Sequence, residues 1–197
     1  MTEYVYEVSG TPPSPGPTPS QTVGPFFHIG LPYDAGPHMV GSARPGAFTL
    51  SGRVLDGAGD PVPDALVELW QADENGEFAR TPGVYAEPAP DGFRGFARCP
   101  TDVDGRYWFR TVRPGPVPTA DGRPQAPHLA MSVFARGMLR RAVTRVYFEE
   151  DGADPLLSSL GEDRRGTLVA APAPDGYRFD VHLQGDDETV FLDGFVG

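Results

Sequence analysis

The sequence predicts an all-β protein, a β-sandwich, from three observations. Glycine and proline make up 25 and 23 of the 197 residues, and each interior proline costs a helix about 3 kcal/mol and each glycine about 1 kcal/mol, which disfavours a mostly helical fold. Short apolar segments recur along the chain, with alternation typical of strands in the first of them. Turn-forming clusters separate these segments. Seven or more short strands arranged in this way predict two packed sheets.

The strand pattern begins at residue 47. Alternation places one set of residues on a single face: Phe48, Leu50, Gly52 and Val54. This run stops at residues 56–61, whose Asp, Gly and Pro residues suit a tight turn. The remaining strand candidates are residues 65–70, 106–112, 129–136, 142–148, 178–183 and 189–192.

One short helix is predicted after the fifth strand candidate. Asp154 is a good N-cap, and Pro155 suits the first helical position because its missing N–H leaves no helical hydrogen bond unmade. Leucines follow at helical spacing, namely Leu156, Leu157 and Leu160.

The chain divides into an extended N-terminal arm rich in proline and glycine, residues 1–46, and a sandwich domain, residues 47–197. Residues 11–19 read TPPSPGPTP and favour extended polyproline-type conformations. Residues 21–29 contain Val23, Phe26, Phe27 and Ile29, and each large apolar side chain left in water forgoes about 1.5–3 kcal/mol. We therefore expect the arm to dock on a partner.

Charge and composition exclude several functions. The formal net charge of −11 repels nucleic-acid backbones and anionic membranes, so neither is an expected partner. All 16 basic residues are arginine, which excludes a lysine Schiff base and the lysine of a P-loop. The single cysteine, Cys99, cannot form an internal disulfide. The first residues are acidic rather than typical of a signal peptide, and we expect a soluble, cytoplasmic protein.

Four histidines are available for chemistry: His28, His38, His128 and His182. For each of them a hydrogen-bonded or solvated structural role is the simpler interpretation from its local sequence. None of the common nucleophile, zinc or nucleotide motifs stands in a supporting context. Spacing alone therefore names no active site.

Several blocks resemble the intradiol ring-cleavage dioxygenases across most of residues 18–193. They read TPSQTVGP from residue 18, DPVPDALVELWQADEN from 60, RCPTDVDGRYWFRTVRPGP from 98 and APHLAMSVFA from 126, with VYFE, RRGTL and YRFDVHLQGDDETVFLD further on. The resemblance implies the family's β-sandwich with long loops. It also implies the family's chemistry, in which two tyrosinates and two histidines hold a non-haem Fe(III).

The resemblance implies that this chain has a degenerate iron site. The family's second tyrosine lies in a Gly-Pro-Tyr-Pro turn where this chain has Val117, and the second histidine of its His-x-His pair is replaced by Ala130. Tyr85 and His128 match the other two ligands in position. Valine and alanine offer no donor atom, so we expect no metal on this chain, and no catalytic residue.

Other positions match residues that line a cleft shared with a homologous beta subunit. They are Thr22, Gly24, Pro25, Phe26 and Arg136, which the resemblance marks as substrate-binding. An arginine can bind the carboxylate of an anionic substrate bidentately, and Arg136 is the candidate for that contact.

The function implied is that of a non-iron alpha subunit in a heteromeric dioxygenase of αβ pairs. With Fe(III) on the beta subunit, the complex would use O2 to cleave protocatechuate to 3-carboxy-cis,cis-muconate, a step of aromatic catabolism in the beta-ketoadipate pathway. Two alternatives stay open: a self-sufficient intradiol dioxygenase acting on another catechol, and a transthyretin-like β-sandwich that binds ligands without a catalytic partner.

Overall fold

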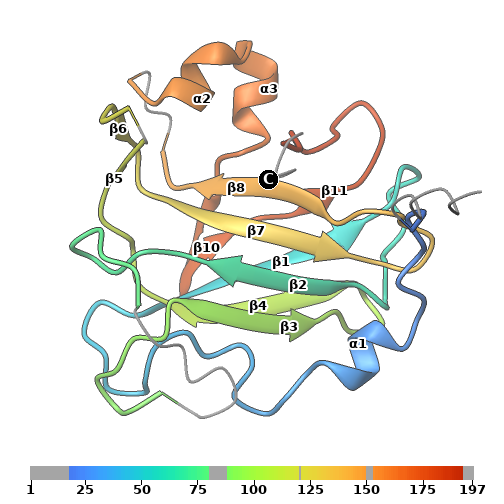
Figure 1. Cartoon of the computed structure of the whole chain (residues 1–197), viewed down its shortest axis with the longest axis horizontal. Coiled ribbons are helices and arrows are strands. Elements are labelled where there is room, and N and C mark those ends of the chain that lie inside the picture. Colours follow the sequence, from blue (N-terminus) through green and yellow to red (C-terminus); the bar gives the residue numbers. More distant parts are fainter. Residues whose placement is uncertain (1–17, 80–87, 120, 150–152, 193–197) are drawn as a thin grey trace, which may run out of the picture.

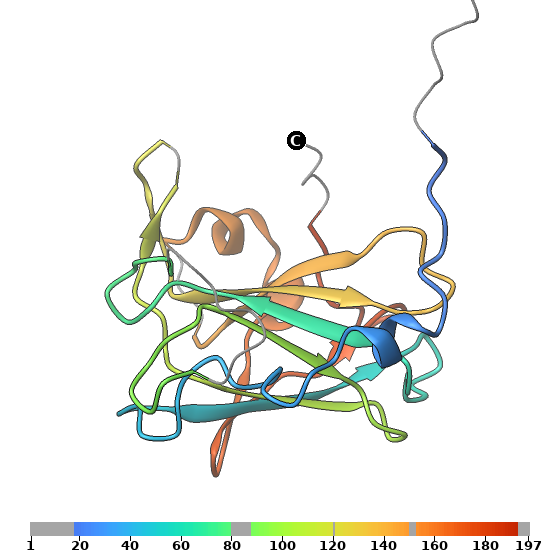
Figure 2. The same cartoon turned by 60° about the horizontal axis from the view of Figure 1, so that its bottom comes forward.

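Two β-sheets packed face to face form the body of the protein, as the computed structural model in Figures 1 and 2 shows. The structure describes residues 18–79, 88–119, 121–149 and 153–192. Figure 2 shows the two layers nearly edge-on, with the arm rising beyond one end of the sandwich. The predicted all-β sandwich is confirmed.

The first sheet is built around β1. Its strands are β1 (Phe48–Leu55), β4 (Arg106–Thr111), β9 (Ala171–Ala173), β10 (Gly176–Arg178) and β11 (Val181–His182). β4 pairs antiparallel with one edge of β1, while β10 and β11 pair parallel with the other. The backbones approach closely there, since a Cβ atom at Gly52 would lie 1.7 Å from the carbonyl oxygen of Phe179. Glycine is required at that point of β1.

The second sheet is antiparallel throughout, in the order β3-β2-β7-β8. Its strands are β2 (Leu66–Trp70), β3 (Phe96–Pro100), β7 (His128–Phe134) and β8 (Ala142–Tyr147). A separate two-stranded ribbon, β5 (Val117–Pro118) with β6 (Pro124–Gln125), stands beside the start of β7. Figure 1 places this ribbon at the same end of the second sheet as the helices α2 and α3.

The core lies between the sheets, and strand alternation explains which residues enter it. In β7, Leu129, Met131 and Val133 are fully buried, while the residues between them face outward and are half-buried. From the first sheet, Leu50 and Phe109 pack into the same cluster. Two-residue periodicity thus divides β7 into a core face and an outer face.

The outer face of the second sheet is partly covered by short helices. α2 (Pro155–Ser159) begins at the predicted cap, because the Asp154 carboxylate accepts hydrogen bonds from the backbone N–H groups of Leu156 and Leu157. Leu157 of this helix is buried in a second cluster that includes Tyr147 and Leu168. The helix α3 (Glu162–Gly166) follows and has no buried residue. This cluster closes one end of the outer face.

Four details of the predicted elements are corrected. The described residues contain three short helices rather than one, because α3 and α1 (Phe27–Gly30) accompany the predicted helix. Residues 189–192 are not a strand; Leu192 makes one backbone bond, to Val143. The segment 178–183 is split between β10 and β11. The strand β3 was not expected.

The arm lies against the sandwich over much of its described length. Met39 and Val40 are fully buried, and Met39 belongs to the core cluster. The backbone N–H of Met39 donates to the carbonyl of Arg110 on β4. The division at residue 46 stays a prediction. In the described part of the chain, none of the helices has the length and apolar character needed to cross a bilayer.

Candidate functional site

A small cavity on the outer face of the second sheet gathers most of the positions where an iron site was expected to be degenerate. We call it the His128 pocket. It has a volume of about 200 Å³ and is lined by Phe78, Val117, Gln125, His128, Ala130, Val143, Thr144, Arg145 and Leu192. The structure thus places residues from the turn motif and from the histidine motif around one space.

Strand register explains why these residues meet. His128 and Ala130 lie two positions apart on the outer face of β7, and β8 pairs with this strand so that Ala130 faces Arg145. In the ribbon, Val117 pairs directly with Gln125. Each pairing joins segments that local sequence patterns do not connect.

His128 is held as a neutral imidazole. Its Nδ1 lies 2.8 Å from the carbonyl oxygen of Ala126, and a carbonyl only accepts, so Nδ1 carries the proton and Nε2 is a free acceptor. Burial, followed by the charge of Arg145, lowers the pKa of His128 to about 4. The pocket therefore presents one uncharged nitrogen acceptor at neutral pH.

Arg145 supplies the positive charge of the pocket. Its Nη1 donates a 3.2 Å hydrogen bond to the hydroxyl of Tyr147, which in turn donates 3.1 Å to the carboxylate of Asp154. That carboxylate also accepts from the backbone N–H of Ala126 at 2.9 Å. Burial is the main reason that the pKa of Tyr147 is raised to about 12. A chain of three side chains thus fixes the guanidinium at the pocket.

The described residues of the pocket do not fit a ferric ion. Val117 and Ala130 offer no donor atom, and Gln125 supplies only a neutral amide. His128 is the one imidazole lining the cavity, and the nearby cation of Arg145 would repel a trivalent metal. Tyr85, the other matched position, lies outside the described residues. Within these residues no group of three His, Cys, Asp or Glu side chains is arranged to hold a metal.

The arm makes a specific contact at the far end of β7. The backbone N–H of Gly137 donates a 2.8 Å hydrogen bond to Oγ1 of Thr22. Gly137 has φ of +83°, a conformation that favours glycine. Next to this contact Phe27 packs on Phe134, with ring centroids 5.2 Å apart. The expected substrate-binding residues of the arm therefore lie beside the loop that carries Arg136.

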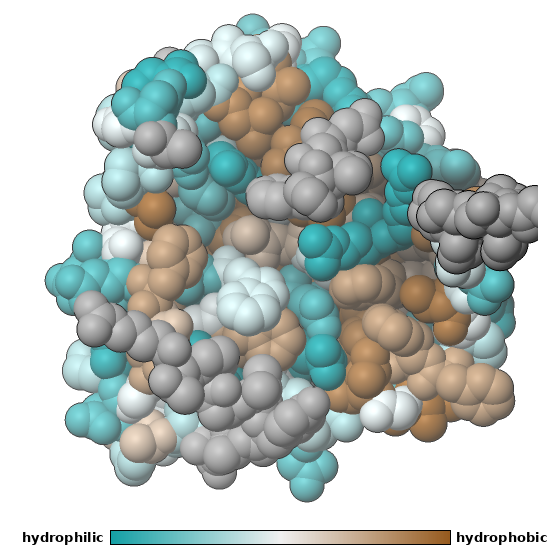
Figure 3. Space-filling view, viewed as in Figure 1, coloured by the Kyte–Doolittle hydropathy of each residue, from teal (hydrophilic) through white to brown (hydrophobic). Residues whose placement is uncertain are grey.

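Phe26 and its neighbours present an open apolar surface. Phe26 is 78% exposed and Ile29 is 65% exposed, while Pro25 is exposed and Gly24 is half-buried at φ of +66°. Figure 3 shows apolar side chains gathered over α1 on this face of the molecule. The arm thus leaves large side chains in solvent around the predicted cleft-lining positions.

Arg136 follows β7 and is paired but accessible. Its Nε lies 3.1 Å from Oδ2 of Asp64, whose side chain is 8% exposed, whereas the Arg136 side chain is 66% exposed. The ion pair is made by the Nε atom of the guanidinium. Because most of the side chain stays exposed, the geometry is compatible both with the expected ligand contact and with a structural pairing.

The two groups of predicted residues lie at opposite ends of β7. His128 opens the strand, and Phe134, on which the arm packs, closes it. At a rise of about 3.3 Å per residue, these ends are roughly 20 Å apart. The structure thus brings the arm and Arg136 together and keeps them away from the His128 pocket.

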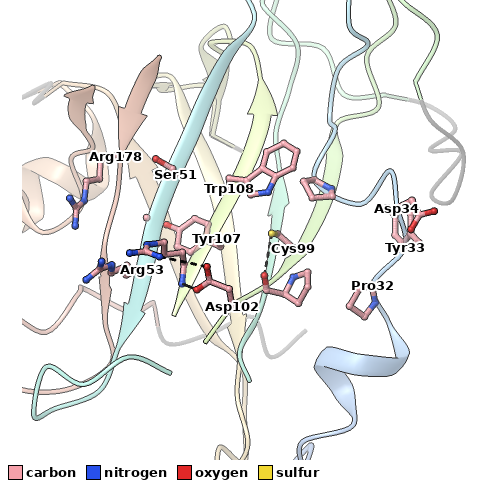
Figure 4. Close-up of a pocket in the computed structure, with 14 residues that line it drawn as sticks. Pro32, Tyr33, Asp34, Ser51, Arg53, Cys99, Asp102, Tyr107, Trp108 and Arg178 are labelled. Atoms are coloured by element: carbon pink, nitrogen blue, oxygen red, sulfur yellow. Dashed lines mark hydrogen bonds and ion pairs between the residues drawn. The ribbon is translucent and has the colours of Figure 1, made fainter. Parts of the chain in front are cut away.

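A larger cavity of about 700 Å³ lies across β1 and β4 and beside the arm residues Pro32–Asp34, as Figure 4 shows. None of the predicted site residues that the structure describes lines it. Two of its arginines, Arg106 and Arg178, pair with neighbouring aspartates. Cys99 in its wall is an unreactive thiol, since burial raises its pKa to about 11.

Arg145 is the residue that sequence reasoning missed at the His128 pocket. It sits in an alternating strand, where its charge is typical of a solvent-facing position. Only its register opposite Ala130 reveals that it faces the pocket. The signal available in the sequence was the pair of small or apolar replacements, Val117 and Ala130, which leave space for a long side chain nearby.

Comparisons with known proteins agree on one family. A family model described as a dioxygenase matches residues 23–185. The protocatechuate 3,4-dioxygenase alpha chain of Burkholderia cepacia is 42% identical over 201 residues, which cover 89% of this chain and 96% of that protein. The beta chain from the same organism is 35% identical over 72% of this chain and 66% of its own length.

The fold has a matching solved structure. The dioxygenase domain of a dioxygenase and carbohydrate-binding protein fusion from Streptomyces sp. SirexAA-E superposes with a TM-score of 0.56 at 27% identity. The match covers 86% of this chain and 99% of that chain.

Proposed function

Because the chain belongs to the intradiol dioxygenase family, we propose that it is the alpha chain of a protocatechuate 3,4-dioxygenase and works in a complex with a homologous beta chain. The observation that carries the proposal is the 42% identity to an alpha chain along 96% of that chain's length. The reaction would be the cleavage of protocatechuate by O2 between its two hydroxylated carbons to give 3-carboxy-cis,cis-muconate.

The beta chain would hold the iron of the complex. Intradiol dioxygenases are Fe(III) enzymes, and the donor-free side chains of Val117 and Ala130 argue against a ferric centre in the His128 pocket. The same two residues argue against a self-sufficient dioxygenase. A binding module without a partner is disfavoured by the similarity to both alpha and beta chains.

The arm and Arg136 would complete the partner's active-site cleft. The hydrogen bond of Thr22 to Gly137, next to Arg136, supports this proposal, and so does the exposure of Pro25 and Phe26 a few residues further along the arm. Substrate and chain are both negatively charged at neutral pH. An exposed guanidinium would offset that repulsion locally and orient the substrate carboxylate through paired hydrogen bonds.

Co-expression with a beta chain tests the proposal. The chain is produced alone, the beta chain alone, and both together, and O2 uptake is measured on protocatechuate, catechol and hydroxyquinol. We expect full activity on protocatechuate only for the co-purified pair, with iron in proportion to the beta chain. Iron-dependent cleavage of any of the three catechols by this chain alone, or failure of the two chains to associate, would overturn the proposal.

A further inference from the structure

We propose that the His128 pocket binds one small aromatic carboxylate that carries a hydroxyl group. This site lies on the alpha chain itself, at the end of β7 away from Arg136, and is separate from the cleft that the arm would complete on the partner. The proposal therefore goes beyond the function proposed above and does not require the complex.

The cavity has the size of a single substituted ring. Its volume is about 200 Å³. Apolar cavities of about 150 Å³ bind benzene, while drug-sized ligands need about 300–1,000 Å³. Apolar side chains, among them Phe78, Val117 and Leu192, line part of the wall. One aromatic ring fills such a space with its faces against these side chains.

Arg145, which has no carboxylate partner among the described residues, favours a negatively charged ligand. Arg145 is half-buried, and none of the carboxylates in the described part of the chain lies within ion-pair distance of it. Asp154, the nearest acid in this network, is already engaged by the Tyr147 hydroxyl and three backbone N–H groups. A ligand carboxylate would supply two oxygen acceptors to the Arg145 guanidinium, which none of the described carboxylates of the protein supplies.

The Nε2 atom of His128, an acceptor in the same pocket, favours a ligand that also carries a hydrogen-bond donor. With Nδ1–H donated to the carbonyl of Ala126, the Nε2 atom of His128 can accept one hydrogen bond. A ligand hydroxyl can donate that bond, whereas an unsubstituted benzoate has no donor to offer. The amide of Gln125 adds a donor and an acceptor at the wall. Together these groups favour a hydroxybenzoate over a plain carboxylate or a neutral phenol.

Binding to the isolated full-length chain tests the proposal, with 4-hydroxybenzoate as the probe. This compound has a single ring hydroxyl and is not a catechol, so ring cleavage does not interfere. Isothermal titration is expected to show one site per chain. Benzoate and 4-hydroxybenzyl alcohol, which lack the hydroxyl and the charge respectively, are each expected to bind at least about 10-fold more weakly, because one hydrogen bond to a charged group or a buried acceptor is lost.

Two variants act on the site by different means. Arg145→Gln removes the charge and is expected to weaken 4-hydroxybenzoate binding by at least about 10-fold. Ala130→Leu fills the cavity from β7 and is expected to abolish binding. Arg106→Gln, on an exposed arginine of the first sheet, is the matched control and should bind like the unmodified chain. Circular dichroism confirms that each variant is folded.

The proposal is overturned by absence of saturable binding to the unmodified chain. It is also overturned if benzoate and the neutral alcohol bind as tightly as 4-hydroxybenzoate, a comparison that needs no variant. Binding that is lost in Arg136→Gln but kept in Arg145→Gln would move the site to the other end of β7 and likewise contradict it.

Discussion

The hydroxyl oxygen of Thr22 accepts a 2.8 Å hydrogen bond from the backbone N–H of Gly137, and so joins residues 115 positions apart. This bond fixes the arm beside the loop that follows β7. Together with the packing of Phe27 on Phe134, it gives the part of the arm around residues 22–27 a defined position on the sandwich. Three of the following predictions concern this contact and its surroundings.

Thr22→Val is expected to release the arm without unfolding the sandwich. A neutral hydrogen bond contributes about 0.5–1.5 kcal/mol, so the open arm should become about 2- to 10-fold more populated. Limited proteolysis within residues 18–30 measures this as a faster cleavage rate, while the melting temperature stays unchanged. Thr18→Val, at an exposed threonine of the same arm, is the control. Equal cleavage rates for the two variants would contradict the prediction.

Arg136→Ala is expected to lower kcat/KM for protocatechuate by about 10- to 150-fold in the assembled complex, since a hydrogen bond to a charged group contributes about 1.5–3 kcal/mol. Activity on unsubstituted catechol should fall much less if the contact is to the carboxylate. Turnover is measured per bound iron.

Asp64→Asn separates this role from structural pairing. It removes the acid that Arg136 binds and leaves the arginine in place. If Arg136 serves only to neutralise Asp64, the two variants should share one phenotype, and kcat/KM per intact iron site should stay at its original value in Arg136→Ala. Either result would contradict the proposed contact between Arg136 and the substrate in the cleft.

Removal of residues 1–27 is expected to impair assembly with the beta chain more than folding of the sandwich. The deletion takes away Phe26, which is 78% exposed, and Phe27, which packs on Phe134, but keeps the buried residues Met39 and Val40. Size-exclusion chromatography of the co-expressed pair and thermal unfolding of the single chain give the two readouts. A truncated chain that assembles into a fully active complex would show that the arm is dispensable.

The chain purified alone is expected to contain no stoichiometric iron and no visible tyrosinate-to-Fe(III) absorption. The physical reason is the donor set of the His128 pocket, in which Val117 and Ala130 cannot coordinate. Elemental analysis after expression in iron-supplemented medium measures the content. One ferric ion per chain, lost on substitution of Tyr85 or His128, would contradict the prediction.

His128 is expected to make the stability of the sandwich fall at acidic pH. Its pKa is about 4 in the folded chain and about 6.5 in an unfolded one. The unfolded state therefore takes up the proton first as the pH falls below about 6.5, and the loss is complete below about 4, where it amounts to about 3 kcal/mol. His128→Gln should flatten urea-unfolding stability over this range. His182→Gln is the control, and an unchanged pH profile in His128→Gln would refute the assignment.

Sequence patterns within a single segment were sufficient to predict β1 and the start of α2. The alternation from Phe48 gave β1, and the Asp154-Pro155 pair gave the start of α2. The strand β3 was missed because it has only five residues, two of which, Ala97 and Pro100, are of types depleted in strands. The charged helix α3 has no buried residue. Its sequence therefore lacks the apolar residues at helical spacing that would predict a helix.

The candidate site was predictable in its parts and not in its arrangement. The replacements at Val117 and Ala130 are visible in the sequence, and the structure gathers them around one pocket. The presence of Arg145 there depends on the register between β7 and β8, and the Thr22 contact depends on a fold-back across the sheet. Both are long-range pairings, which the local physics of a segment does not encode.

The parallel pairing of β1 with β10 and β11 sets the order in which the sandwich can be completed during synthesis. Thr49 pairs with Gly176, and Leu55 pairs with His182. One edge of β1 therefore stays unpaired until residues 176–182 have left the ribosome. Contacts of such high sequence separation slow folding, because a long loop must close before they form. The nascent sandwich therefore exposes an unpaired strand edge for most of its translation, and an edge of this kind makes a partly folded chain prone to aggregation.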